Sequence, residues 1–239
     1  MIRDHRPYYV KRLYRKMESW YARRRLGPQF ERLGKGGTFF KPWNVELFGP
    51  RISMGNFATI IAAPDRRVRF CVWPAEAESG EIRIGDYGLV CPGARIGSAS
   101  GVFIGDNCMI ASGAYITDSD WHGLYDRVST GTASPVTISE NVWIGDGAMI
   151  CKGVSVGRNS VIGAGAVVTR DVPDDAVAAG NPAAVVKRLD PGKPRVPRDR
   201  WFADPDRLAR ELDQWDRDIL RQNTTGHWLR HLLVPRRGD

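Results

Sequence analysis

A period of six residues constrains this chain more than any other feature. From residue 84 the sequence divides into rows of six that begin with Ile or Val, such as IGDNCM at 104–109 and IGAGAV at 162–167. Twelve rows follow this rule, and they begin at residues 84, 90, 96, 104, 110, 116, 138, 144, 150, 156, 162 and 168. A short repeat of fixed length indicates a solenoid, in which units stack on one another around a common core.

Each place in the row has a physical reason. The β-branched residue at the first place suits a short strand with one inward side chain. The fifth place holds small or short residues, as a crowded corner demands. The fourth place holds residues that tolerate left-handed backbone angles, so the chain is expected to turn there. These are Gly93, Gly113, Gly147, Gly153, Gly165, Asn107, Asn141, Asn159 and Asp171. Strands of two or three residues with a turn every six close a triangular coil in about eighteen residues.

Composition sets further bounds. The 26 glycines of 239 residues fit repeated tight turns. No stretch reaches the roughly 18 apolar residues of a membrane span, and the N-terminus lacks the apolar core of a signal peptide, so a cytoplasmic location is expected. The four cysteines (Cys71, Cys91, Cys108 and Cys151) show no C-x-x-C pairing and are interpreted as reduced structural residues.

Positive charge gathers at the two ends of the chain. Residues 1–41 hold 12 Lys and Arg against 3 Asp and Glu, whereas residues 42–186 hold 10 against 15. Residues 187–239 hold 13 against 9. A protein that bound nucleic acid along its body would not divide its charge in this way, so no nucleic-acid partner is expected and any anionic partner should meet the ends.

The segment PVTISENVWIGDGAMICKGVSVGRNSVIGAGAVVTRDVPDDAVAAGNPAAVVKRL at 135–189 closely resembles bacterial hexapeptide-repeat acyltransferases, similar to galactoside, maltose and polysaccharide O-acetyltransferases. The resemblance is weaker over 84–134 and absent from both ends of the chain. It implies a left-handed parallel β-helix, a hand that the period alone does not supply, and assembly as a homotrimer. It also implies an enzyme that moves an acyl group from acetyl-CoA, or another acyl-CoA, to a hydroxyl or amine, with a saccharide as the expected acceptor.

One long insertion interrupts the repeat, at 117–137 between Ile116 and Ile138, and it contains His122. Long excursions from a regular solenoid are commonly functional loops. His122 is the one histidine of the repeat body, because His5, His227 and His231 lie near the ends of the chain. Acyl transfer to a hydroxyl or amine needs a general base, and imidazole suits that task. Related enzymes place their base just before a P-x-x-I-x-x-x-V-W-I-G segment, and His122 is predicted to be that base.

A carboxylate commonly orients such a histidine. Asp118, Asp120 and Asp126 are all near in sequence. In an extended segment Asp120 and His122 would point to the same side, which favours Asp120 as the second catalytic residue. A solvated loop carboxylate is the alternative for each of the three.

The resemblance also implies a coenzyme A groove. It places Trp143 at the acyl end, Asp146 near the thiol, and Ala164 and Thr169 along the pantetheine and adenine portions. The predicted phosphate-side cations are Arg170, Lys187 and Arg188. One departure matters here: Ala184 follows Gly180–Ala183 where related enzymes carry a basic residue.

Two alternatives stay open at this point: a non-catalytic trimeric β-helix scaffold, and an enzyme of another reaction class on the same fold. A γ-type carbonic anhydrase needs three histidine ligands for zinc, which one body histidine does not provide, and no metal site is expected. The identity of the acceptor, O- versus N-transfer and the length of the acyl chain are not readable from the sequence.

The predicted organisation is a basic amphipathic helical arm at 1–41, a β-helix at 42–189, and a linker with a C-terminal helix at 190–239. Apolar residues at helical spacing run through 7–26, with Lys and Arg on the other side. This arm could cap the open end of the β-helix or lie on the inner face of an anionic membrane. A second helix is expected from Asp204 and Pro205.

Overall fold

The computed structural model describes residues 4–73, 79–129 and 131–236, and its main body is a left-handed parallel β-helix with three faces. Sheet A contains β1 (Arg32–Leu33), β4 (Ile52–Met54), β7 (Ile82–Ile84), β10 (Val102–Ile104), β13 (Val136–Ile138) and β16 (Ser155–Val156). Sheet B contains β2 (Thr38–Phe40), β5 (Thr59–Ile61), β8 (Leu89–Val90), β11 (Met109–Ile110), β14 (Trp143–Ile144), β17 (Val161–Ile162), β19 (Ala176–Gly180) and β20 (Ala183–Arg188). Sheet C contains β3 (Val45–Phe48), β6 (Val68–Val72), β9 (Arg95–Ser98), β12 (Tyr115–Thr117), β15 (Met149–Ile150) and β18 (Val167–Val168).

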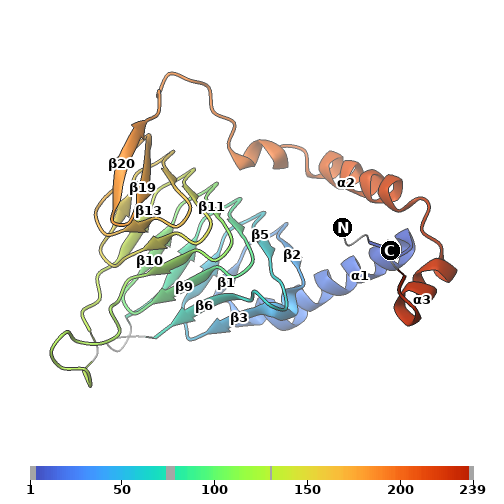
Figure 1. The fold of residues 1–239 in the computed structure, drawn as a ribbon, viewed down its shortest axis with the longest axis horizontal. Coiled ribbons are helices and arrows are strands. Elements are labelled where there is room, and N and C mark those ends of the chain that lie inside the picture. Colours follow the sequence, from blue (N-terminus) through green and yellow to red (C-terminus); the bar gives the residue numbers. More distant parts are fainter. Residues whose placement is uncertain (1–3, 74–78, 130, 237–239) are drawn as a thin grey trace. The chain divides into compact units, whose positions relative to one another are not determined.

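Consecutive strands belong to different sheets, and each strand pairs in parallel with the strand one coil away (Figure 1). The exception is β20, which runs antiparallel to β19 and ends sheet B. The chain therefore turns three corners in every coil. The corners lie between sheets A and B, between B and C, and between C and A.

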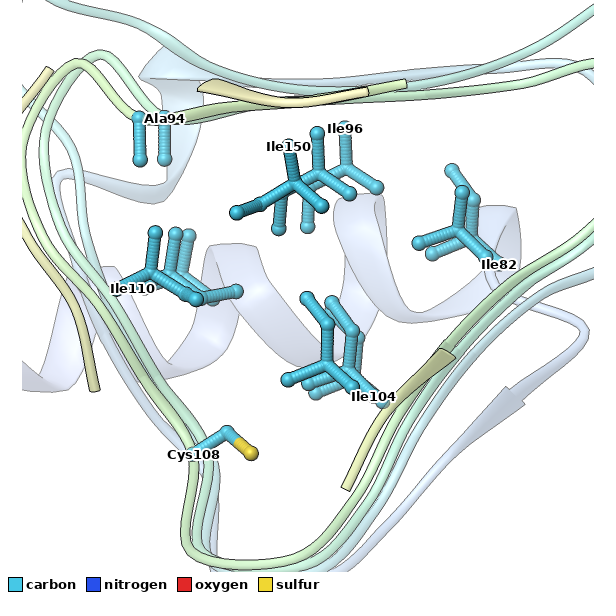
Figure 2. Packing of buried hydrophobic residues seen from close by; sticks show 14 of the residues in the cluster. Ile82, Ala94, Ile96, Ile104, Cys108, Ile110 and Ile150 are labelled. Carbon is cyan, nitrogen blue, oxygen red and sulfur yellow. The ribbon is translucent and has the colours of Figure 1, made fainter. Parts of the chain in front are cut away.

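The row-initial residues build the core, as the period predicts. All twelve are buried, and equivalent isoleucines of successive coils stack above one another inside the triangle (Figure 2). Small fifth-place residues such as Ala94 and Cys108 occupy the corners of that section. Burial of this branched aliphatic column, at roughly 25 cal/mol per Å² of apolar surface, is the main stabilising contribution to the body.

Eight of the nine fourth-place residues have positive φ, which confirms the predicted turns. Asp171 does not; its carboxylate instead accepts a hydrogen bond from the Ser155 backbone N–H at 2.7 Å. In one column of corners Asn141, Asn159 and Asp175 have φ of 55°, 57° and 53°. The side chain of Asn159 joins the other two, at 2.9 Å to Asn141 and 3.1 Å to Asp175.

The β-helix begins before residue 42, so the predicted boundary there falls within its first coil. Strands β1 and β2 already pair with β4 and β5. Ahead of them, the π-helix Ala22–Leu26 and Phe30 pack into the hydrophobic core, with Leu26 only 1% exposed. The end of the segment 7–26 thus closes this end of the core, because without it the first coil would expose apolar side chains.

A second compact unit comprises residues 1–20 and 200–239, of which 4–20 and 200–236 are described. Its helices are α1 (Tyr8–Tyr21), α2 (Pro205–Leu220) and α3 (Thr225–Leu233). The ammonium of Lys11 lies 2.6 Å from the Asp216 carboxylate. Asp204 caps α2 by accepting the Arg207 backbone N–H at 2.8 Å, as the sequence predicts. Among the described helices none has the length and apolar character needed to cross a membrane.

Candidate functional site

The long insertion leaves the β-helix at the corner between sheets C and A. It connects β12 to β13, strands that otherwise sit in regular coils. Most of the loop is exposed, and Leu124, Tyr125 and Val128 are among the most exposed apolar side chains of the described chain. His122 is exposed on the same loop.

Asp118 fixes the start of the loop. Its side chain is fully buried and accepts four hydrogen bonds from the preceding coil of the β-helix. The donors are the Ser98 hydroxyl and the backbone N–H groups of Ala99, Ser100 and Gly101, at 2.6–2.9 Å. A carboxylate with this many donors is a structural anchor, so its acceptor positions are committed away from His122.

The other two carboxylates also have partners of their own. Asp120 forms an ion pair with Lys152, which belongs to the next coil along the axis. Asp126 accepts the Val128 and Ser129 backbone N–H groups at 3.0 and 3.3 Å, and these bonds lower the pKa of its carboxyl. The role of Asp120 as the residue that orients His122 stays a prediction, because the structure pairs its carboxylate with an ammonium.

His122 lines a groove of about 700 Å³ on the outer face of sheet C. Trp121, which has φ of 63°, lies over Gly97: a Cβ at Gly97 would be 3.4 Å from the indole ring. The indole N–H of Trp121 donates to the Tyr115 hydroxyl at 3.3 Å. Gly97 therefore makes room for the ring that precedes the candidate base.

Sequence reasoning missed the other wall of this groove. Arg69, Cys71 and Trp73 line it from β6 and the residue after β6, and Arg95 lines it from β9. Burial raises the pKa of the Cys71 thiol. A signal was present in the sequence. In VRFCVW at 68–73 and ARIG at 94–97, the residues that line the groove alternate with apolar residues that face the core.

The predicted coenzyme-binding residues are distributed over several faces. Trp143 lies on sheet B with 49% of its surface exposed. Asp146 and Ala164 lie in consecutive coils at the corner between sheets B and C, where the Gly165 backbone N–H donates to the Asp146 carbonyl at 2.8 Å. Both side chains are exposed, so one extended molecule along that corner could touch both.

Thr169 and the predicted phosphate-side cations lie elsewhere. Thr169 and Arg170 follow β18 at the corner between sheets C and A, whereas Lys187 and Arg188 are exposed on β20 in sheet B. The corner between C and A is opposite sheet B in a three-sided coil. One chain therefore does not bring His122 and Trp143 into the same groove.

Within the described ranges, no group of three or more His, Cys, Asp or Glu side chains is placed to hold a metal ion. The groove beside His122 offers an imidazole, aromatic rings and guanidinium groups. These can accept a proton, pack against a ring and bind an anion.

Comparison with known families gives two matches. Residues 135–170 match the model described as bacterial transferase hexapeptide (six repeats), and residues 82–118 match the hexapeptide repeat of succinyl-transferase. The two matches lie on either side of the inserted loop.

Among known proteins, the Saccharomyces cerevisiae protein YJL218W, which carries the name of an acetyltransferase, is 44% identical over 123 residues, 50% of this chain and 60% of its own length. Galactoside O-acetyltransferase of Escherichia coli is 42% identical over 90 residues, 37% of this chain and 44% of its own length. The chain thus spans about half the length of these relatives.

A solved structure of AntD, an N-acyltransferase from Bacillus cereus, covers 70% of this chain and 88% of its own, with 18% identity and a TM-score of 0.54. At that identity the likeness supports the fold alone. The resemblance of the repeat body to hexapeptide-repeat acyltransferases, galactoside O-acetyltransferases among them, is confirmed.

Proposed function

We propose that the chain is an acyltransferase that moves an acyl group, acetyl in the simplest case, from coenzyme A to a hydroxyl or amine, with His122 as general base. The observation that carries the proposal is the position of His122. The histidine of the repeat body stands on the one long insertion and lines a groove large enough for a small acceptor. The similarity of the repeats to acetyltransferases supports the reaction class.

The chemistry requires little more than a base and a positioned thioester. The acceptor oxygen or nitrogen attacks the thioester carbonyl while His122 takes its proton, and the tetrahedral intermediate then expels the coenzyme A thiolate. His122 then gives its proton to that thiolate, which leaves as free thiol. A general base in this role contributes about 10²–10⁴-fold to the rate. Release of free thiol therefore measures turnover without knowledge of the acceptor's identity.

Coenzyme A would occupy the corner between sheets B and C together with its neighbouring edges. Asp146 and Ala164 would face the thiol and pantetheine portions and Trp143 the acyl end. Arg170, Lys187 and Arg188 are the proposed phosphate cations, and Thr169 a proposed adenine-side contact. Exposure of all these side chains supports the assignment, because each is accessible to a ligand.

The separation of His122 from Trp143 favours a site shared between chains in a homotrimer. A single flat face cannot enclose both substrates, yet efficient attack needs them held and oriented. Heterologous contacts around a threefold axis would repeat one groove three times, with the loop of one chain facing sheet B of the next. The exposed loop residues Leu124, Tyr125 and Val128 supply apolar surface for such a contact.

Subunit mixing tests the shared site. His122→Ala is co-refolded with a variant disabled at Lys187 and Arg188, which lie on β20 in sheet B, and each variant refolded alone is the control. Activity regained in the mixture supports grooves built from two chains. A mixture that exchanges subunits, shown by mass spectrometry, and still releases no thiol from acetyl-CoA would contradict it. A folded parent that neither binds coenzyme A nor releases thiol would favour the non-catalytic scaffold.

We also propose that the protein is a cytoplasmic enzyme that makes a peripheral contact with the inner face of an anionic membrane. This second proposal rests on α1. Tyr9, Leu13, Met17 and Trp20 follow one another at helical spacing and are 45–67% exposed. Aromatic and aliphatic side chains with flanking Lys and Arg suit a lipid interface. Such a contact would bring the site to a lipid-linked acceptor.

A further inference from the structure

A ladder of polar and aromatic residues crosses sheet C beside His122. Glu46 on β3 is the register partner of Arg69 on β6, Arg69 is the partner of Arg95 on β9, and Arg95 is the partner of Tyr115 on β12. Register partners project from the same face of a sheet. Arg69, Arg95 and Tyr115 all line the groove that contains His122.

The two arginines of this ladder are held differently. Arg69 donates from Nε to the Glu46 carboxylate at 2.6 Å, and Arg67 binds the same carboxylate. The hydrogen bond from Arg67 lowers the pKa of Glu46, which keeps this carboxylate ionised. The guanidinium of Arg95 instead lies over the Tyr115 ring, 4.3 Å from its centroid. Stacking on an aromatic face leaves the N–H edges of a guanidinium available to a ligand.

The local charge is positive. An adjoining hollow of about 350 Å³ is lined by Arg66, Arg67, Arg69 and Arg95, together with the carboxylate of Asp65. With Glu46 included, four guanidinium groups face two carboxylates. Like charges directly opposite on neighbouring strands are destabilising unless something compensates them, and a bound oxyanion between Arg69 and Arg95 would do so.

We propose that Arg95 and Arg69 bind an oxyanion of the acyl acceptor, a phosphate or a carboxylate group, and thereby hold the acceptor's hydroxyl or amine toward His122. Guanidinium forks match the paired oxygens of both groups. The ring of Trp121, whose indole N–H donates to the Tyr115 hydroxyl at 3.3 Å, forms a wall against which a saccharide ring can pack. The acceptor class is therefore an anionic saccharide, a sugar phosphate or a uronic acid.

The anion belongs to the acceptor rather than to coenzyme A, because it shares one groove with the base. In coenzyme A the pantetheine arm separates the phosphates from the thioester. A thioester within reach of His122 therefore places its own phosphates well away from the groove. The identity of the second substrate rests on the acyltransferase function proposed above, whereas the anion site itself does not.

Calorimetry with inorganic pyrophosphate tests the site directly, at low salt and with coenzyme A first absent and then saturating. The parent is compared with Arg95→Met and with Arg83→Met as matched control. Arg83 is an exposed strand arginine on sheet A that pairs with Glu81 and lies over the Phe103 ring, so it resembles Arg95 in setting but faces away from the groove. We expect Arg95→Met to weaken pyrophosphate binding by about 10-fold to 100-fold, in line with the loss of charged hydrogen bonds.

Competition experiments and the effect of coenzyme A show which ligand the site takes. Competition by glucose 1-phosphate or by glucuronate, but not by glucose, identifies the phosphate or the carboxylate source. The proposal is wrong if the parent does not bind pyrophosphate, or if Arg95→Met binds it as tightly as the parent does. It is also wrong if saturating coenzyme A abolishes pyrophosphate binding, because the groove would then hold the phosphates of the donor. A protein that binds pyrophosphate through Arg95 but does not bind coenzyme A keeps the anion site and refutes the acyltransferase function.

Discussion

The carboxylate of Asp118 accepts the backbone N–H of Gly101 at 2.6 Å, and this contact joins the His122 loop to the preceding coil. Two further N–H groups and a hydroxyl bind the same buried carboxylate. The proposed base is therefore carried on a loop that is anchored at its start. Leu124, Tyr125 and Val128 of the same loop are exposed and accessible to another surface.

Asp118→Ala should destabilise the protein by about 3 kcal/mol or more, because several buried donors lose their acceptor. Asp118→Asn keeps an acceptor oxygen and should cost less. Chemical denaturation gives the comparison, with Asp126→Ala as the control, since Asp126 is an exposed carboxylate of the same loop. Equal stability of Asp118→Ala and Asp126→Ala would show that the anchor contributes little.

Asn159 tests the turns of the repeat. Its φ is 57°, and its side chain bridges Asn141 and Asp175. Asn159→Ala should lower the free energy of unfolding by about 1–2 kcal/mol, because alanine loses the side-chain bridge and lacks the polar side chain that makes the left-handed region acceptable to Asn. Asn159→Gly should cost less, although it also loses the side-chain bridge. An alanine variant at least as stable as the glycine variant would contradict this reason for Asn at the fourth place.

Cys108 should be inert in the folded protein. Burial raises the pKa of its thiol to about 12, so almost no thiolate exists at pH 8. Iodoacetamide should label this residue only after denaturant is added, as mass spectrometry of the labelled peptide would reveal. Because the pKa is raised in the folded state, this thiol's contribution to stability is complete below its ordinary pKa and is lost as the pH rises toward 12. Rapid labelling of Cys108 in the native protein at pH 8 would refute the assignment.

The membrane proposal needs substitutions rather than a deletion of residues 1–26, because that deletion would also remove Leu26 from the core. We expect the double change Leu13→Glu and Trp20→Glu to abolish sedimentation with phosphatidylserine vesicles at low salt. Val196→Glu, a like change at an exposed apolar residue outside the helices, should leave it intact. If the unsubstituted protein never sediments with such vesicles, the membrane proposal is wrong, and the role of this segment is the cap formed by Ala22, Leu26 and Phe30.

The repeat body could be predicted because the residue type at each place of the six-residue row determines the local conformation. Ile110 and Ile144 face inward since every row starts with a branched residue, and Asn159 turns the chain since its type tolerates positive φ. The start of the β-helix was harder, because β1 and β2 lie outside the regular rows. The pairing of Asp120 with Lys152 and the ladder from Glu46 to Tyr115 were not predictable. They depend on which residues meet one coil apart, across 20 to 32 residues of sequence.

His122→Ala tests the central claim most directly. Arg127→Ala, a change at another exposed residue of the same loop, is the control. Initial rates of thiol release from acetyl-CoA are measured with glucose, glucosamine, glucose 1-phosphate and glucuronate as acceptors. Loss of a general base should reduce kcat by about 10²–10⁴-fold. The free energy of unfolding should change by less than about 0.5 kcal/mol, as is usual for exposed loop positions. A His122→Ala protein that turns over at the parent's rate would show that His122 is not the base.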